Sequence, residues 1–540
     1  MWDILIKGGK VVDGSGNPWF KADIAIKNGQ ITDIGSLNSN SADVVIEATN
    51  MIVCPGFIDM HSHSDFALLI NRYAESKVRQ GVTTEVIGNC GNSAAPLNDE
   101  LRKDIKRENP IIQEAGIMLN WAKMEEFFKI LEKLGISINV VALVGHRNIR
   151  VLTMGYQNKP PTEEELEEMK RNAEEAMKAG AFGLSTGLIY PPSSYADTNE
   201  IIELAKVVAK YGGIYASHIR GEDGPRLINS VREAIEIGEK AGVSVEISHH
   251  KAHGKLAWGK VKTTLRMIEE ARERGVDATC DVYPYTAASF GLSAILPPEV
   301  HEGGVDKILE RLKDAEWRRK IREEMLNGMP NWPSPFISAG WDAIMISYSK
   351  KHPEYEGKMI KEICDSLNVD PFEFIFNLLI EEEASTEVVR FTMREGDVCT
   401  VLSHPLSMVG SDASIQATYG LLSKGKPHPR AYGTFPRVIK RYVNEFGILR
   451  LEEAIRKMTS LPANKLKIFD RGIIRTGMWA DIVVFNPSII SDEATYAEPH
   501  RYPKGIEYVI VNGKIVVDHG EHMKALPGKV LRLTHEKHRR

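Results

Sequence analysis

The sequence predicts a (β/α)₈ barrel of the TIM type that carries a small β-sandwich made from both chain termini. The first observation is that strand-like and helical segments alternate through residues 55–467, as in a parallel barrel. The second is that the two ends, residues 1–54 and 468–540, share a strand-rich pattern. The third is a helix-rich stretch at about 295–400 that interrupts the alternation, and we interpret it as an insertion before the last barrel strand.

The size and charge of the chain restrict its class. Its 540 residues exceed one ordinary domain, and 43% hydrophobic with 26% charged residues is the balance of a globular protein. A net charge of −5 gives no general attraction to nucleic acid or anionic membranes, and no apolar run approaches the ~20 residues of a membrane span. Five scattered cysteines favour a reducing cytoplasm. We therefore expect neither a nucleic-acid nor a membrane partner, and we leave homo-oligomer formation open.

The termini and the middle of the chain carry different periodicities. Both ends place short apolar runs between Gly and Asn turns, with a hairpin signal at Asn28-Gly29. In the middle, the segment from Thr162 to Ala179 has helical spacing and a capping box with Glu165. A doubly wound sheet is the alternative fold, but the absence of a Gly-rich phosphate loop after the first strand favours the barrel. The eight expected strands end near Asp59, Val86, Leu143, Leu184, Ser217, Ser248, Tyr283 and Gly410.

The stretch at 295–400 holds long amphipathic, charge-rich helices and a Pro/Trp-rich segment at 329–336. Loops and insertions near the mouth of a barrel often act in function, so this one is interpreted either as a lid or as a set of packing helices without a gating role. The final HEKHRR, residues 535–540, is interpreted as a solvated tail.

Metal-ligating side chains follow several of the expected strands, at the face where parallel barrels carry their active sites. His61 and His63 follow the first strand and point to the same side of an extended chain. Cys90 follows the second strand, and a bound metal would favour its thiolate. His218 and His249 end the fifth and sixth strands. Each alone has an ordinary structural explanation, but together they predict a metal site.

Two further choices complete this site. Adjacent residues of a strand face opposite ways, so only one of His249 and His250 can enter the barrel mouth, and we select His249. Asp412 ends the eighth strand. It could be a helix N-cap, but beside a metal it would act as the carboxylate that carries the proton, and we favour that role.

At this point the chain resembles the amidohydrolase superfamily, and within it the D-aminoacylases, or N-acyl-D-amino-acid deacylases. The superfamily resemblance rests on PGFIDMHSH, the two later histidines, the strand-eight Asp and LPANKLKIFDRGIIRTGMWADIVVFNP. The closer resemblance rests on GVTTEVIGNCG, FGLSTGLIYPP, SHIRGE, ISHHK, DVYPYTAAS, VLSHPLSMVGSDAS and HPRAYGTFPRVI. These segments run from about residue 54 to 486, which is nearly the whole chain.

The resemblance implies zinc as the metal. Cys90, His218 and His249 would hold one zinc tightly, and His61 with His63 would form a weaker or partly occupied second site. Many relatives in the superfamily bridge two metals with a carboxylated lysine on strand four, but AFGLST offers none here. Cys90 looks like the substitute, which argues against a hydantoinase or a dihydroorotase.

The resemblance also implies the reaction, which is hydrolysis of the amide bond of N-acyl-D-amino acids with Asp412 as the proton carrier. Lys251, Tyr283, Ser289 and Arg430 stand at the positions of a clamp for the substrate carboxylate, and Tyr190 is a further candidate at the same mouth. The segment between Asp412 and Arg430 departs from the family pattern, so side-chain preference stays open.

Two alternatives remain. One is another amidohydrolase, such as a dipeptidase or a dihydropyrimidinase-like cyclic-amide hydrolase. Lys251 and Arg430 argue for a free α-carboxylate, which cyclic amides lack. The other is a non-catalytic protein on the same fold, against which the complete set of expected ligands argues.

Overall fold

A computed structural model describes residues 1–38, 41–329, 332, 334, 336 and 339–534. Half of the Pro/Trp-rich segment at 329–336 and the predicted solvated tail at 535–540 lie outside the described residues. Within the described part of the chain, no helix is long and apolar enough to cross a membrane.

The centre of the molecule is a closed parallel barrel, which confirms the predicted fold class. Hydrogen bonds from Met60 N to Val409 O (3.3 Å) and from Asp412 N to His61 O (2.8 Å) join the last strand to the first. All eight strands end within three residues of the expected positions. The strands, in barrel order, are β6 (Phe57–Asp59), β7 (Val82–Ile87), β8 (Asn139–Ala142) with its continuation β9 (Val144–Gly145), β10 (Gly183–Gly187), β11 (Ile214–His218), β12 (Ser244–Ile247), β13 (Ala278–Val282) and β17 (Ser407–Val409).

The helices that surround the barrel follow the signals in the sequence. Helix α7 (Glu163–Ala179) begins at the predicted capping box, where Thr162 Oγ1 accepts the Glu165 N–H and the Glu165 carboxylate accepts the Thr162 N–H. Gly180 ends this helix in the left-handed region, at φ 104°. The others are α1 (Ala67–Ile70), α2 (Glu75–Val78), α3 (Asp99–Glu108), α4 (Pro110–Glu114), α5 (Met124–Leu134), α6 (His146–Met154), α8 (Thr198–Lys210), α9 (Leu227–Ala241), α10 (Val261–Glu273), α15 (Glu395–Ser403), α16 (Arg430–Arg437), α17 (Leu451–Met458) and α18 (Ser460–Lys465).

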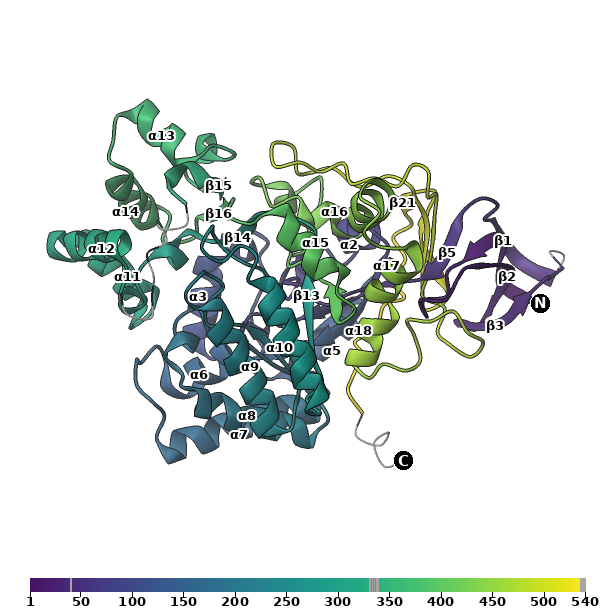
Figure 1. Cartoon of the computed structure of the whole chain (residues 1–540), viewed down its shortest axis with the longest axis horizontal. Helices are drawn as coiled ribbons and strands as arrows, with labels where there is room; N and C mark the ends of the chain where they lie inside the picture. The colour runs from purple at the N-terminus through teal and green to yellow at the C-terminus, as the bar shows by residue number, and fades with distance from the viewer. Residues whose placement is uncertain (39–40, 330–331, 333, 335, 337–338, 535–540) are drawn as a thin grey trace.

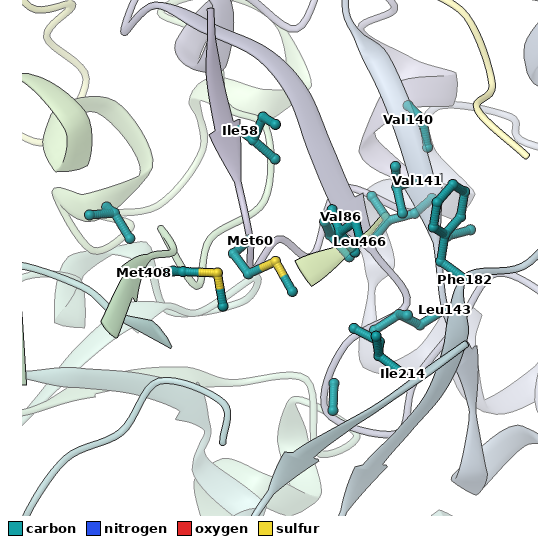
Figure 2. Packing of buried hydrophobic residues seen from close by; sticks show 14 of the residues in the cluster. Ile58, Met60, Val86, Val140, Val141, Leu143, Phe182, Ile214, Met408 and Leu466 are labelled. Atoms are coloured by element: carbon teal, nitrogen blue, oxygen red, sulfur yellow. The ribbon is translucent and has the colours of Figure 1, made fainter. Parts of the chain in front are cut away.

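Apolar side chains fill the barrel and the layer between strands and helices. Ile58, Val86 and Met408 come from three different strands, and Leu466, just after α18, packs against the same cluster (Figure 2). Because this core is close-packed, it holds the strand ends, and therefore the residues that follow them, in fixed relative positions.

The two termini share one nine-stranded sheet at the far end of the molecule from α11–α14 (Figure 1). The predicted hairpin is present, with Asn28 and Gly29 at φ 51° and 81° between β2 and β3. Residues of both ends, such as Ile4 and Ile482, pack in one hydrophobic core. The strands are β1 (Trp2–Val11), β2 (Phe20–Lys27), β3 (Gln30–Gly35), β4 (Ala42–Glu47), β5 (Ile52–Pro55), β18 (Ile482–Phe485), β19 (Ile506–Val511), β20 (Lys514–Asp518) and β21 (Glu521–His522).

The insertion differs from the expected set of helices because it contains a small antiparallel sheet. Strand β16 (Glu387–Arg390) pairs with both β14 (Ala288–Gly291) and β15 (Ile344–Tyr348). Helix α15, expected inside the insertion, instead packs on α10 of the barrel. The insertion has a hydrophobic core of its own. Its helices are α11 (Val305–Lys313), α12 (Ala315–Asn327), α13 (Ile360–Leu367) and α14 (Pro371–Glu381).

Candidate active site

The six residues singled out as metal ligands and proton carrier all lie at the C-terminal mouth of the barrel. Because parallel strands end at the same rim, residues that are far apart in sequence meet there. They are His61 and His63 after β6, Cys90 after β7, His218 at the end of β11, His249 after β12 and Asp412 after β17.

Four of these side chains meet around one point. Cys90 Sγ lies 3.3 Å from His61 Nε2 and 3.4 Å from His249 Nε2. Asp412 Oδ1 lies 3.5 Å from His61 Nε2, and all four donor atoms fall within 4.8 Å of one another. Ligands of one tetrahedral zinc are about 3.3–3.8 Å apart, as follows from Zn–N and Zn–S bond lengths. The spacing and the mixture of sulfur, nitrogen and oxygen donors therefore fit zinc.

His218 and His63 extend this group. His218 Nδ1 lies 3.0 Å from His249 Nε2, and its buried Nε2 has no hydrogen-bond partner among the described residues. His63 Nε2 lies 3.0 Å from Asp412 Oδ1, and its side chain is 33% exposed. The site therefore has enough donors for a second ion, of which His63 is the most open.

Three of these residues have left-handed backbone conformations: Cys90 at φ 53°, His249 at φ 36° and Asp412 at φ 52°. Such conformations are strained, least so for Asp and His, and they are typical of functional sites. A Cβ on Gly187 of β10 would lie 2.3 Å from the Cys90 carbonyl oxygen. Strand four therefore touches the Cys90 loop so closely that only glycine fits at this position.

The electrostatic environment keeps both Cys90 and Asp412 ionised. Burial alone would raise the pKa of the Cys90 thiol, but the neighbouring imidazoles, His61 first, hold it well below its ordinary value. Burial also opposes ionisation of Asp412, yet the Arg430 guanidinium at 2.7 Å keeps the pKa of this carboxyl well below its usual range. A thiolate ligand and a carboxylate that can accept a proton are thus both available.

The orientation of the two adjacent histidines follows the strand geometry. The His249 ring faces Cys90 and His218 in the barrel mouth, whereas His250 Nε2 hydrogen-bonds to Thr264 Oγ1 of α10 at 2.8 Å. His250 therefore anchors the end of β12 to the helix layer.

Four of the five candidate substrate-binding residues, Tyr190, Lys251, Ser289 and Arg430, line the same cavity, whose volume is about 680 Å³. The fifth, Tyr283, lies next to two of them. The Arg430 guanidinium and the Lys251 ammonium lie 4.6 and 5.6 Å from the centre of the Tyr283 ring. The Tyr190 ring meets His218 edge-on at 4.9 Å. Ser289, on β14, brings the insertion to the cavity wall. Two cations therefore lie near the proposed metal ligands, as recognition of a carboxylate would require.

Comparisons with known proteins assign the chain to a family. An amidohydrolase family model matches residues 368–517. The chain is 36% identical to N-acyl-D-glutamate deacylase of Alcaligenes xylosoxydans xylosoxydans, over 98% of this chain and 96% of that protein. It is 34% identical to D-aminoacylase of the same organism, over 95% and 94%. The chain belongs to the D-aminoacylase family of amidohydrolases.

Solved structures give the same assignment. The crystal structure of N-acyl-D-glutamate deacylase from Bordetella bronchiseptica, complexed with zinc and a phosphonate that mimics the tetrahedral intermediate, matches with a TM-score of 0.82 and 34% identity. This match covers 98% of the present chain and 99% of the other. A D-aminoacylase crystal structure matches with a TM-score of 0.81 and 33% identity, over 98% and 100% of the two chains.

Two carboxylates near the candidate metal donors were not predicted from the sequence of this member of the D-aminoacylase family. Asp281 Oδ1 accepts the His249 N–H at 2.8 Å, and its Oδ2 lies 3.5 Å from His61 Nδ1. Glu222 Oε1 lies 2.6 Å from Lys251 Nζ and 3.2 Å from His249 Nδ1. The Asp281 contact holds the His249 backbone, and the Glu222 contact orients the His249 ring. The sequence offered one signal for each residue. Asp281 lies in DVYPYT at the end of a predicted strand, and Glu222 lies in SHIRGE just after one.

A buried lysine below the site links the first and last strands. Lys77 Nζ donates to Asp59 Oδ2 and to Ser411 Oγ, both at 2.6 Å, and to the Ala413 carbonyl at 2.8 Å. Both ionised side chains are fully buried. This network holds the backbone on either side of Asp412 against the end of β6.

We expect Lys77→Met to lower the free energy of unfolding by about 3–5 kcal/mol, because it leaves the Asp59 carboxylate buried without its counter-ion. Denaturant unfolding measures this value. Lys123→Met is the matched control, since its ion pair with Glu175 is exposed on both sides. Equal stability of the two variants would contradict a structural role for the Lys77 network.

Proposed function

We propose that this protein hydrolyses the amide bond of N-acyl-D-amino acids and releases a carboxylate and a free D-amino acid, with zinc as cofactor. The observation that carries the proposal is the meeting of thiolate, imidazole and carboxylate donors in one cavity with Lys251 and Arg430. The N-acyl-D-glutamate deacylase of Bordetella bronchiseptica was crystallised with zinc. For D-aminoacylase, one-metal activation and second-metal attenuation are described. We propose the same arrangement here, with one tight zinc and a weaker second site.

Zinc bound by these donors supplies Lewis-acid chemistry, in that it polarises a carbonyl and makes a water molecule more acidic. The chain supplies the proton transfer. Asp412, ionised and within hydrogen-bond reach of His63, accepts the proton of the attacking water and returns it to the leaving nitrogen. The Arg430 contact favours the carboxylate form that starts this cycle.

The substrate carboxylate pairs with the cations at the mouth. Arg430 and Lys251 both lie over the Tyr283 ring, and Ser289 can donate a further hydrogen bond from β14. A dihydropyrimidine ring has no free carboxylate to fill this place, so the clamp favours linear acyl amino acids and dipeptides over this class of cyclic amide. D-stereospecificity rests on the relatives, three of which at 34–36% identity act on D-amino-acid derivatives.

The experiment that tests the proposal measures amino acid released from matched N-acetyl-D- and N-acetyl-L-amino acids by the zinc-loaded protein. We expect release from D-substrates only. The panel also includes D-dipeptides and dihydropyrimidines, and turnover of these alone would favour the dipeptidase or the cyclic-amide hydrolase.

We expect Arg430→Ala to lower kcat/KM for N-acetyl-D-amino acids, because it removes a charge-assisted pair with the substrate carboxylate. The loss of transition-state stabilisation should be about 2–5 kcal/mol. The α-amide analogue of the same substrate should lose less, since it lacks the carboxylate. Part of the loss is common to both substrates, because Arg430 also contacts Asp412. An equal loss on both would mean that Arg430 only positions Asp412.

For the compartment we propose the cytoplasm. All five cysteines are free in the structure, as a reducing environment would leave them.

A further inference from the structure

The cavity is much larger than a small N-acetyl amino acid requires, and one part of it is apolar. A volume of about 680 Å³ suits a ligand of drug size, so an acetyl group would leave much of this space to water. We define the apolar lobe as the cavity-lining residues Ile70, Leu101, Ile105, Ile111, Ile295 and Ile308.

The apolar lobe lies between the barrel and the insertion. Leu101 and Ile105 come from α3, Ile70 ends α1, and Ile308 lies on α11 of the insertion. Two ion pairs join α3 to α11, because Lys103 and Arg107 both reach Asp306 at 2.6 Å. The insertion therefore covers α3 and encloses the lobe.

The charged groups nearest to this lobe are already paired. Arg147 binds both oxygens of Glu108, at 2.6 and 3.1 Å, and also contacts the Tyr156 hydroxyl at 2.9 Å. The six side chains that define the lobe are all apolar, so the lobe favours an apolar occupant.

The position of the lobe relative to the clamp decides which part of the substrate enters it. Lys251 follows β12, the sixth strand, whereas α3 follows β7, the second, and these strands are half a barrel apart. In an N-acyl amino acid, the acyl chain and the carboxylate leave the scissile bond from opposite sides. With the carboxylate at Lys251 and Arg430 and the carbonyl at the metal donors, the acyl chain points toward the strand-two side.

We propose that the apolar lobe binds an extended aliphatic acyl chain, so that the preferred substrates are N-acyl-D-amino acids with medium-length or long acyl groups. This inference rests on the proposed function and names its substrate class. Each methylene that leaves water for an apolar wall strengthens binding, and this energy can be used in the transition state.

The test compares kcat/KM for N-acetyl, N-butyryl and N-octanoyl derivatives of the D-amino acid that the stereospecificity panel identifies as best. We expect a rise of roughly two- to fourfold per methylene, which over the six methylenes that separate acetyl from octanoyl gives at least about 60-fold. Equal or falling values along the series, with the acetyl substrate still hydrolysed, would overturn the inference. So would a gain that follows the amino-acid side chain from D-alanine to D-phenylalanine instead of the acyl length. Hydrolysis of no acyl-D-amino acid would overturn the proposed function itself.

Two variants locate the effect. Ile111→Trp fills the lobe from a half-buried position and should lower the octanoyl-to-acetyl ratio of kcat/KM by at least about tenfold. Leu256→Trp is the matched control, because Leu256 also lines the cavity but lies on the strand-six side. Ile70→Asn, polar rather than bulky, should lower the same ratio. An unchanged ratio in both lobe variants would exclude the lobe as the acyl site.

Discussion

Replacing Asp412 with Asn should lower kcat by ~10²–10⁴, because the amide cannot accept and return a proton. Zinc should be retained by Cys90 and the histidines, and the fold should be unchanged. The structure makes this variant more informative than the sequence alone did. In the described part of the chain no helix begins at Asp412, so the N-cap explanation of this residue is wrong. Asn also tolerates the left-handed backbone at φ 52°, and its amide oxygen can still accept from Arg430.

The matched control for this variant is Asp370→Asn. Asp370 caps α14 by accepting the N–H groups of Phe372 and Glu373, a role that Asn performs equally well. This control should keep full activity and stability. Near-normal turnover of the Asp412 variant with zinc bound would remove Asp412 from the proton transfer.

Replacing Cys90 with Ser should release the tightly bound zinc and lower kcat/KM by at least about 10³-fold, because the metal supplies several kcal/mol of charge stabilisation. Serine keeps the size of the side chain but stays protonated near neutral pH, whereas the Cys90 thiol is held in its ionised form. Metal analysis of dialysed protein measures the first effect.

Cys399→Ser is the control for this second prediction, since Cys399 is half-buried on α15 and free. It should retain both zinc and activity. If the Cys90 variant also retained one zinc per chain, the tight site would have to be built from the histidines and Asp412 without the thiolate.

The barrel, the terminal sheet and the helix ends could be predicted because their signals are local. The capping box of α7 and the Asn28-Gly29 turn each lie within a few residues. The sheet of the insertion could not be predicted from the sequence. Strand β14 pairs with β16, about a hundred residues later, and each of these strands has only four residues. Strands this short contain too few alternations of apolar and polar residues to be distinguished from the surrounding helices.

The candidate donors could be predicted from the rule that strand ends meet at one face of a barrel. The contacts that support these donors could not be predicted, because no local sequence pattern indicates them. Lys77 contacts Ser411, which is 334 residues away, and Asp281 contacts His249. The contact between Arg430 and Asp412 was missed for another reason, since each residue had been given a separate role. The structure shows that Arg430 and Asp412, the proposed clamp residue and the proposed proton carrier, are neighbours.

The most direct test of the central claim titrates metal-free protein with zinc while the hydrolysis of an N-acyl-D-amino acid is followed. We predict no activity without metal and an increase that is nearly complete with about one zinc per chain, because one set of donors around Cys90 and His249 binds tightly. The matched L-substrate should remain intact at every zinc concentration. Full activity of the metal-free protein, or no activity at any zinc concentration, would contradict the account.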